Sequence, residues 1–250
     1  MMNHSLYWNY KYLILAFGIL LFVGCKKDSD DAAPPTNNTS TTISFKINYE
    51  IDGQPLIFDS LLYYNDAGNH YQVSSLLYFL TEIELVRQDS SIIRIKDYQY
   101  IDASILSTGQ FSISDPPAGN YIGLRFNIGV DSIHNIPGGL PANTDNNNME
   151  WPVTMGGGYH HMKFEGYFVD GGSPFGFAMH LGMNACLVPV RLYQPISITS
   201  TSSSLNLTMN LNEWFRNPSV YDFNVDGNYT MGVMPLMMKL SANGKDVFHL

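Results

Sequence analysis

The sequence predicts an all-β fold, an antiparallel β-sandwich with Greek-key-type connections and short helices near the C-terminus. Along several segments, apolar residues recur at every second position, as they do on strands that bury one face. Turn-forming segments interrupt this pattern at intervals of roughly ten residues, which is typical of a sandwich. Hydrophobic residues make up 45% of the 250 residues, which is enough for a sizeable core.

The first clear alternation lies at residues 43–51, where isoleucine, phenylalanine and tyrosine alternate with polar residues. Residues 122–130 repeat the pattern after a turn at 115–120, whose two prolines and one glycine cannot continue a strand ladder. We therefore expect half-buried antiparallel strands in both segments. Further strands are expected at residues 82–87, 92–98, 159–169, 175–181, 187–193 and 205–211.

Two segments near the C-terminus, residues 212–215 and 234–240, are expected to form short helices. The polar stretch at residues 135–148 contains two prolines, two glycines and a run of asparagines. It is therefore expected to be a long loop, which is either functional or a tolerated surface insertion.

The first 42 residues differ in composition from this domain. Residues 1–24 resemble a signal peptide, because an uncharged apolar run from Leu13 to Val23 ends at a small residue, Gly24. Such a run covers only ~18 Å as a helix, well short of the ~30 Å hydrocarbon core of a membrane. Residues 25–42 are mainly small and polar and predict a disordered linker. One domain is expected at residues 43–250.

The segment from Leu21 to Cys25 resembles the bacterial lipobox, which implies cleavage before Cys25 and acylation of its thiol. Stable anchoring then needs more than one acyl chain. The acidic residues that follow, Asp28, Asp30 and Asp31, fit either a surface-export tag or an ordinary charged tether. We expect an outer-membrane lipoprotein on the periplasmic or cell-surface face.

Charge and motifs exclude several functions. The chain has 13 basic and 22 acidic residues, a net charge of −9, which argues against nucleic-acid binding. Acylation of Cys25 would leave Cys186 without a partner for an intramolecular disulfide. Nucleophile-elbow, phosphate-loop and metalloprotease-helix motifs are missing from the sequence, so no enzymatic activity is expected.

Potential metal ligands are concentrated between residues 131 and 186. Imidazole suits copper and zinc, and thioether selects Cu(I). Methionines are otherwise common core fillers, and isolated histidines are often only hydrogen-bonded. The ligand types in this stretch are His134, His160, His161, His180, Met149, Met155, Met162, Met179 and Met183.

The expected strands 159–168 and 175–181 should form a hairpin, and its loop decides which residues face His180. A loop with an even number of residues places His161, Lys163 and Glu165 on the face of His180. An odd-numbered loop places His160, Met162 and Phe164 there instead. Both arrangements are compatible with the sequence.

A series of short motifs carries a family resemblance. In order, they are Gly129-Val130-Asp131, His134-Asn135, Met149-Glu150-Trp151, Gly158-Tyr159, Lys163-Phe164-Glu165-Gly166 and His180-Leu181-Gly182. The chain resembles the MbnP-like copper-binding family over nearly all of residues 43–250. The resemblance implies an exported β-sandwich that binds copper through histidines. In some members, a partner diheme enzyme of the MauG type converts a tryptophan to kynurenine.

By this resemblance, His180 matches the histidine of the family's His-Leu-Gly motif and Trp151 matches its first tryptophan, a possible modified residue. Val153 stands where the second tryptophan is usual, and His134 precedes Asn135 instead of following it. The chain has no Cys-x-x-Cys-His haem motif, so any oxidation of Trp151 requires a partner enzyme. We expect Trp151 to be unmodified.

The sequence thus predicts a non-enzymatic lipoprotein that binds copper, as Cu(I), for copper acquisition or handling. The expected ligands are His180 and His134, with His160, His161 or Met162 completing the site. The alternative is a metal-free cell-surface interaction protein on the same scaffold, which contacts a glycan, peptide or protein through its loops.

The anchor can be tested by Cys25→Ser, which removes the acyl acceptor. We expect labelled fatty acid to be absent from the variant, and uncleaved or soluble precursor to accumulate. Incorporation of label at the wild-type level would show that Cys25 is not the lipid site.

Overall fold

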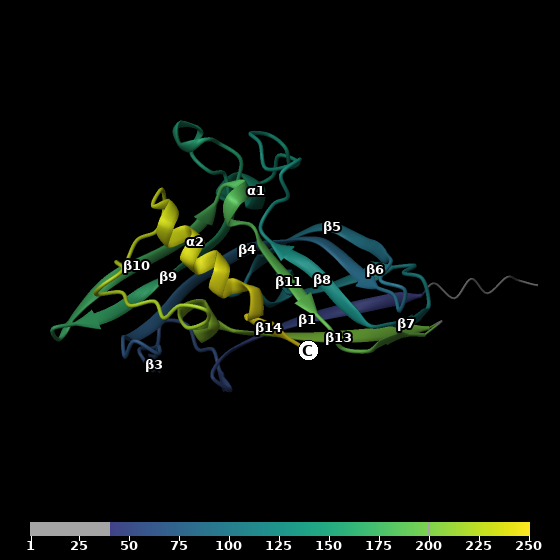
Figure 1. Ribbon diagram of the computed structural model, residues 1–250, viewed down its shortest axis with the longest axis horizontal. Coiled ribbons are helices and arrows are strands. Elements are labelled where there is room, and N and C mark those ends of the chain that lie inside the picture. Colours follow the sequence, from purple (N-terminus) through teal and green to yellow (C-terminus); the bar gives the residue numbers. More distant parts are fainter. Residues whose placement is uncertain (1–40, 200) are drawn as a thin grey trace, which may run out of the picture. The chain divides into compact units, whose positions relative to one another are not determined.

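The computed structural model describes residues 41–199 and 201–250. The predicted signal peptide, acylation site at Cys25 and nearly all of the predicted linker lie outside the described residues. The described chain folds as a β-sandwich, as the sequence predicts (Figure 1).

The first sheet has five strands. Its order is β14-β13-β1-β2, and β6 also pairs with β1. The alternation at residues 43–51 lies on β1, but β1 pairs with β13 in parallel, from Thr42 opposite Ser202 to Glu50 opposite Asn210. The expectation that β1 is purely antiparallel is therefore wrong on this side. The strands are β1 (Thr42–Ile51), β2 (Gln54–Pro55), β6 (Gln110–Ser114), β13 (Ser202–Asn210) and β14 (Phe248–His249).

The second sheet has seven strands and carries most of the predicted ligands. Its order is β10-β9-β4-β8-β11, and β3 and β5 also pair with β4. The strands are β3 (Tyr63–Tyr64), β4 (His70–Val86), β5 (Ile92–Asp102), β8 (Gly123–Ile128), β9 (His160–Asp170), β10 (Ser173–Gly182) and β11 (Val188–Leu192). β4 is far longer than the predicted strand at 82–87. It pairs with β9 along its first half and with both β5 and β8 along its second half.

Smaller elements connect the sheets. The two predicted C-terminal helices are confirmed as η4 and α2, and the long polar loop contains one turn of helix, α1. Among the described residues, no helix is long and apolar enough to cross a membrane. The elements are β7 (Gly119–Tyr121), β12 (Ile196–Ile198), α1 (Thr144–Asn148), α2 (Met234–Asn243), η1 (Leu106–Thr108), η2 (Val153–Met155), η3 (Asn184–Cys186), η4 (Leu211–Phe215) and η5 (Gly244–Asp246).

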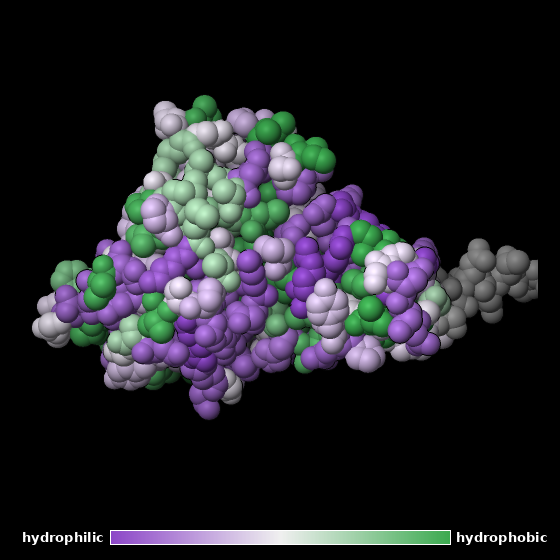
Figure 2. All heavy atoms as spheres, viewed as in Figure 1, coloured by the Kyte–Doolittle hydropathy of each residue, from purple (hydrophilic) through white to green (hydrophobic). Residues whose placement is uncertain are grey.

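The two sheets share one apolar core. Phe248 of β14 packs edge-on against Phe126 of β8, with ring centroids 5.2 Å apart, and the hydroxyls of Tyr49 on β1 and Tyr78 on β4 lie 2.9 Å apart. An aromatic pair such as Phe126 and Phe248 adds about 0.5–1.5 kcal/mol beyond area burial. In the view of Figure 2, polar residues cover much of the lower surface, and moderately apolar residues gather above it, where α2 begins.

Candidate metal centre

The β9–β10 hairpin positions His180. Gly171 and Gly172 form its two-residue loop, each with a positive φ, as tight hairpin turns require. This even-numbered loop places His180 opposite Lys163. His180 Nε2 and Glu165 Oε1 are 2.7 Å apart, so Glu165 shares the face of His180, as the even-loop alternative predicts.

A β-bulge changes which histidine joins them. The register of the hairpin shifts between Leu181 and Gly182, so Gly182 pairs with His160. An extra residue in one strand reverses the alternation of faces. The rings of His160 and His180 therefore meet edge to face, with centroids 5.1 Å apart. His160 was expected there only for an odd-numbered loop.

Trp151 closes the other side of His160. Its ring centroid is 4.8 Å from that of His160, and its indole N–H donates to the Met155 carbonyl at 3.2 Å. The indole packs directly on Gly182, where a Cβ would come within 2.3 Å of the ring. The absence of a side chain at Gly182 is therefore what lets Trp151 lie beside the histidine pair.

In each histidine of the pair, one ring nitrogen is hydrogen-bonded and the other has no hydrogen-bond partner. His160 Nδ1 lies 3.2 Å from the Met149 carbonyl and therefore donates to it, while Glu165 accepts from His180 Nε2–H. His160 Nε2 and His180 Nδ1 are buried and have no hydrogen-bond partner. Buried polar atoms without a partner are uncommon and require an explanation. Two imidazole nitrogens with free lone pairs are a donor set that copper accepts.

The electrostatics keep His160 neutral. Burial lowers its pKa to about 3, and the positive charge of Lys163 acts in the same direction. Burial also lowers the pKa of Lys163, whose Nζ donates to the Asn148 carbonyl at 2.5 Å. The hydrogen bond from His180 lowers the pKa of Glu165. His160 therefore stays available as a ligand well below neutral pH.

Thr230 holds the backbone of His180. Its Oγ accepts from the His180 N–H and donates to the His180 carbonyl, both at 2.8 Å. No motif in the sequence points to Thr230, which lies 50 positions from His180 in a loop before α2.

The other predicted ligands have different surroundings. His161 is fully buried, accepts at Nδ1 from the Val130 N–H and donates from Nε2 to the Met183 carbonyl, so both nitrogens are in use. His134 lies on the loop after β8, half-exposed, with its Nδ1 2.7 Å from Asp131 Oδ2. Met162 is fully buried in the main core. Within residues 41–199 and 201–250, no group of three His, Cys, Asp or Glu side chains could hold a metal ion.

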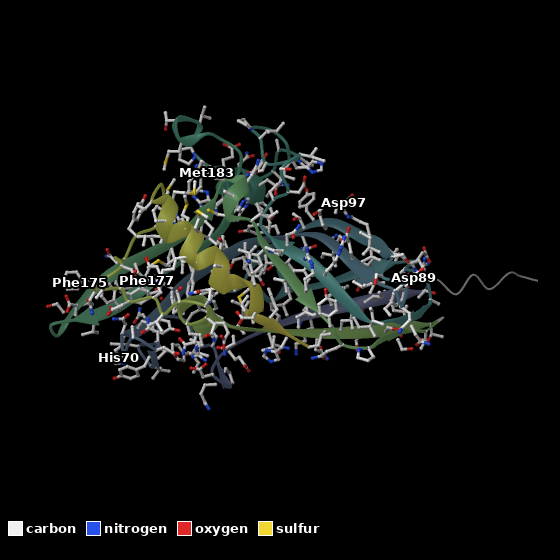
Figure 3. All side chains as sticks on the ribbon, in the orientation of Figure 1. His70, Asp89, Asp97, Phe175, Phe177 and Met183 are labelled. Carbon is white, nitrogen blue, oxygen red and sulfur yellow. The ribbon has the colours of Figure 1, made fainter. Side chains whose placement is uncertain are left out.

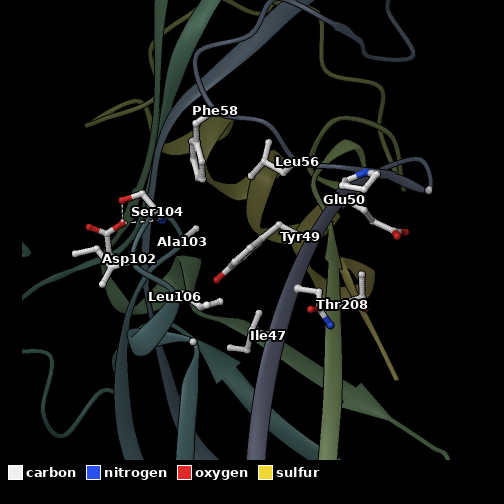
Figure 4. Close-up of a pocket in the computed structure, with 15 residues that line it drawn as sticks. Ile47, Tyr49, Glu50, Leu56, Phe58, Asp102, Ala103, Ser104, Leu106 and Thr208 are labelled. Carbon is white, nitrogen blue, oxygen red and sulfur yellow. Dashed lines mark hydrogen bonds between the residues drawn. The ribbon is translucent and has the colours of Figure 1, made fainter.

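A cavity of about 620 Å³ lies between β1 and the segment that follows β5 (Figure 4). Apolar side chains such as Leu56 and Phe58 line it, and its charged lining residues, Glu50 and Asp102, are both acidic. It shares no lining residue with the histidine pair and offers neither imidazole nor thioether. It is therefore separate from the candidate metal centre.

Comparisons with known proteins agree with this architecture. The MbnP family model matches residues 40–234 of the 250. The solved structure of MbnP from Methylosinus trichosporium superposes with a TM-score of 0.55 at 13% identity, covering 84% of this chain and 98% of that one. At that identity the likeness shows the fold alone. No curated protein sequence matches the chain significantly.

The buried histidines make stability depend on pH. Burial lowers the pKa of His161 to about 4, whereas an unfolded histidine titrates near 6.5. Below pH 6.5, His161 is protonated in the unfolded chain but stays neutral in the folded chain. This residue alone should therefore lower the free energy of unfolding by about 2 kcal/mol between pH 6.5 and 4.5. Urea unfolding of His161→Gln should show a shallower pH dependence than wild type. An unchanged slope in His161→Gln would contradict the assignment.

Proposed function

The chain belongs to the MbnP family, and from that premise we propose that it is an exported protein that binds copper, as Cu(I), for copper acquisition or handling. The observation that carries the proposal is the pair of buried imidazoles at the end of the β9–β10 hairpin. His160 Nε2 and His180 Nδ1 both lack a protein partner. The family resemblance supplies the identity of the metal.

The surroundings of the pair suit a metal ligand. Glu165 accepts from the outer nitrogen of His180, and the Met149 carbonyl accepts from that of His160, so each ring is fixed in one tautomer. Histidines that ligate metals are usually oriented in this way, by a carboxylate or a backbone carbonyl. His160 and His180 are therefore the proposed ligands, in place of the pair of His134 and His180 favoured by the sequence.

Trp151 is proposed as a packing wall of the site. Its indole N–H is already bonded, its ring fills the space over Gly182, and Val153 at the second tryptophan position is 76% exposed. We propose that this indole stays chemically unmodified. A diheme partner would be needed only if Trp151 were oxidised.

We also propose that the protein is non-enzymatic and is held at the outer membrane by lipid on Cys25, on its periplasmic or cell-surface face. The lipobox-like segment, the acidic residues after Cys25 and the small polar linker support this placement.

A metal-free binding role on the same scaffold is the second candidate, and the cavity beside β1 favours it. Its apolar lining, with Glu50 and Asp102 as the charged residues, suits a small apolar molecule that carries a positive charge. A double variant of His160 and His180 that binds as many copper ions as wild type would remove the argument for the histidine site. A wild-type chain that binds no copper would leave this alternative.

Copper affinity tests the proposed ligands. His160→Ala and His180→Ala should each weaken Cu(I) binding to the purified chain at least tenfold, roughly 1.4 kcal/mol, because each removes a ligand. The measurement is anaerobic competition against a calibrated Cu(I) chelator. His134→Ala is the matched control, since His134 is half-exposed and pairs with Asp131, and it should bind as wild type does. Equal affinities for wild type and His180→Ala would exclude His180 from the site.

The role of Trp151 is tested by mass spectrometry of the protein from its native host, in which the Trp151 peptide should have the mass of unmodified tryptophan. Trp151→Phe should lower the free energy of unfolding by about 2 kcal/mol, less than the 3–5 kcal/mol of truncating a buried tryptophan to alanine. Its Cu(I) affinity should change less than that of His180→Ala. The mass of a kynurenine at this position would overturn the proposal and imply a diheme partner.

A further inference from the structure

Five sulfur-bearing side chains gather next to the histidine pair, where β10 ends and α2 begins. Figure 3 shows sulfur atoms near Met183 and the start of α2. We call this group the sulfur cluster; it consists of Cys186, Met155, Met183, Met231 and Met234. Cys186 is fully buried, and the four methionines are half-buried against the main core.

These methionines differ from those that only fill the core. Met162, Met179 and Met209 are fully buried within the strands, as expected for packing residues. The four thioethers of the sulfur cluster instead come from three loops or element ends and remain partly open to solvent around one buried thiol. The cluster therefore combines a buried soft ligand with an accessible thioether rim.

The central contact has the geometry of a shared ligand pair. Cys186 Sγ lies 3.7 Å from Met234 Sδ. With metal–sulfur bonds of about 2.3 Å, a cation bound by both atoms at this separation would have an S–metal–S angle of about 107°, close to tetrahedral. The two sulfurs thus already stand at the separation that a common metal ion requires.

The other methionines are fixed around this pair by backbone contacts. The Met183 carbonyl accepts the Cys186 N–H at 2.9 Å. The methyl of Met155 lies over Gly232, only 2.5 Å from where a Cβ of that residue would stand, and Gly232 lies between Met231 and Met234 in the chain. Segments from η2, the end of β10 and the start of α2 therefore meet at this pair and bring further methionines into its neighbourhood.

We propose that the sulfur cluster is a second metal site, separate from the histidine pair, which binds one Cu(I) through Cys186 Sγ and Met234 Sδ with a neighbouring thioether. On binding, the S–H bond of Cys186 breaks, its proton leaves to solvent, and the thiolate forms the copper–sulfur bond without any change in oxidation state. Mixed thiolate and thioether ligands select Cu(I) over harder cations.

The two sites are neighbours. The Met155 carbonyl accepts from Trp151, which packs on His160, and Thr230, which holds His180, directly precedes Met231. Copper captured at the accessible thioether rim would therefore lie next to the histidine pair. The choice of copper rests on the proposed function, whereas the soft-metal character of the cluster does not.

Anaerobic Cu(I) titration of the purified full chain tests the proposal. Wild type should bind two Cu(I), and Cys186→Ser and Met234→Leu should each lose one equivalent or weaken one site at least tenfold. Met238→Leu is the matched control, because Met238 is on the same helix but 51% exposed and outside the cluster, and it should bind as wild type does. Binding should release one proton at the sulfur site in wild type and none in Cys186→Ser.

The double variant His160→Ala/His180→Ala separates this proposal from the proposed function. It should retain one Cu(I), with copper X-ray absorption showing sulfur neighbours at about 2.3 Å. If the histidine variants keep full stoichiometry while the sulfur variants lose one copper, the histidine site fails and the sulfur site stands. Undiminished binding in Met234→Leu, which preserves side-chain volume, or copper without sulfur neighbours in the double variant, would overturn the sulfur site even if Cys186→Ser does not fold.

Discussion

The β-bulge at the end of the β9–β10 hairpin controls the arrangement of the whole candidate centre. Strict alternation after the two-residue turn would direct His161 toward His180, yet both nitrogens of His161 bond to backbone groups. The extra residue brings His160 to that face and gives Gly182 as its strand partner. Because Gly182 has no side chain, Trp151 can then pack over the bulge and beside His160.

Burial of two imidazoles with unbonded nitrogens opposes folding, since each buried polar atom without a partner costs about 1–3 kcal/mol. The fold offsets this cost with fixed neighbours: Glu165 and the Met149 carbonyl orient the rings, and Thr230 holds the backbone of His180. A ligand bound through both nitrogens would remove this cost. The adjacent sulfur cluster adds softer ligands to the same region. The end of β10 therefore has imidazole nitrogens and sulfur atoms close to each other.

Much of this fold could be predicted, because strands that bury one face alternate in sequence, and the motifs around His180 indicated the family. The pairing partners of the strands could not be predicted, because nothing within residues 43–51 specifies a parallel neighbour at Ser202–Asn210. The first half of β4 was missed because its alternation is short: it runs from His70 to Val73 and is then interrupted by Ser74, Ser75 and a shift in register against β9. The hairpin was expected, but its bulge was not: it lies where Trp151 packs against Gly182, a contact between segments that periodicity does not encode.

The parallel pairing of β1 with β13 also bears on the order of folding. Thr42 meets Ser202 only after nearly the whole domain has been synthesised, whereas the β9–β10 hairpin joins neighbouring residues across two glycines. Loops that long are entropically costly to close, and high contact order slows folding. We therefore expect the hairpin that carries the histidines to form as a local unit before the five-stranded sheet closes. Until it closes, the edge of β1 that later pairs with β13 is free to pair with another chain.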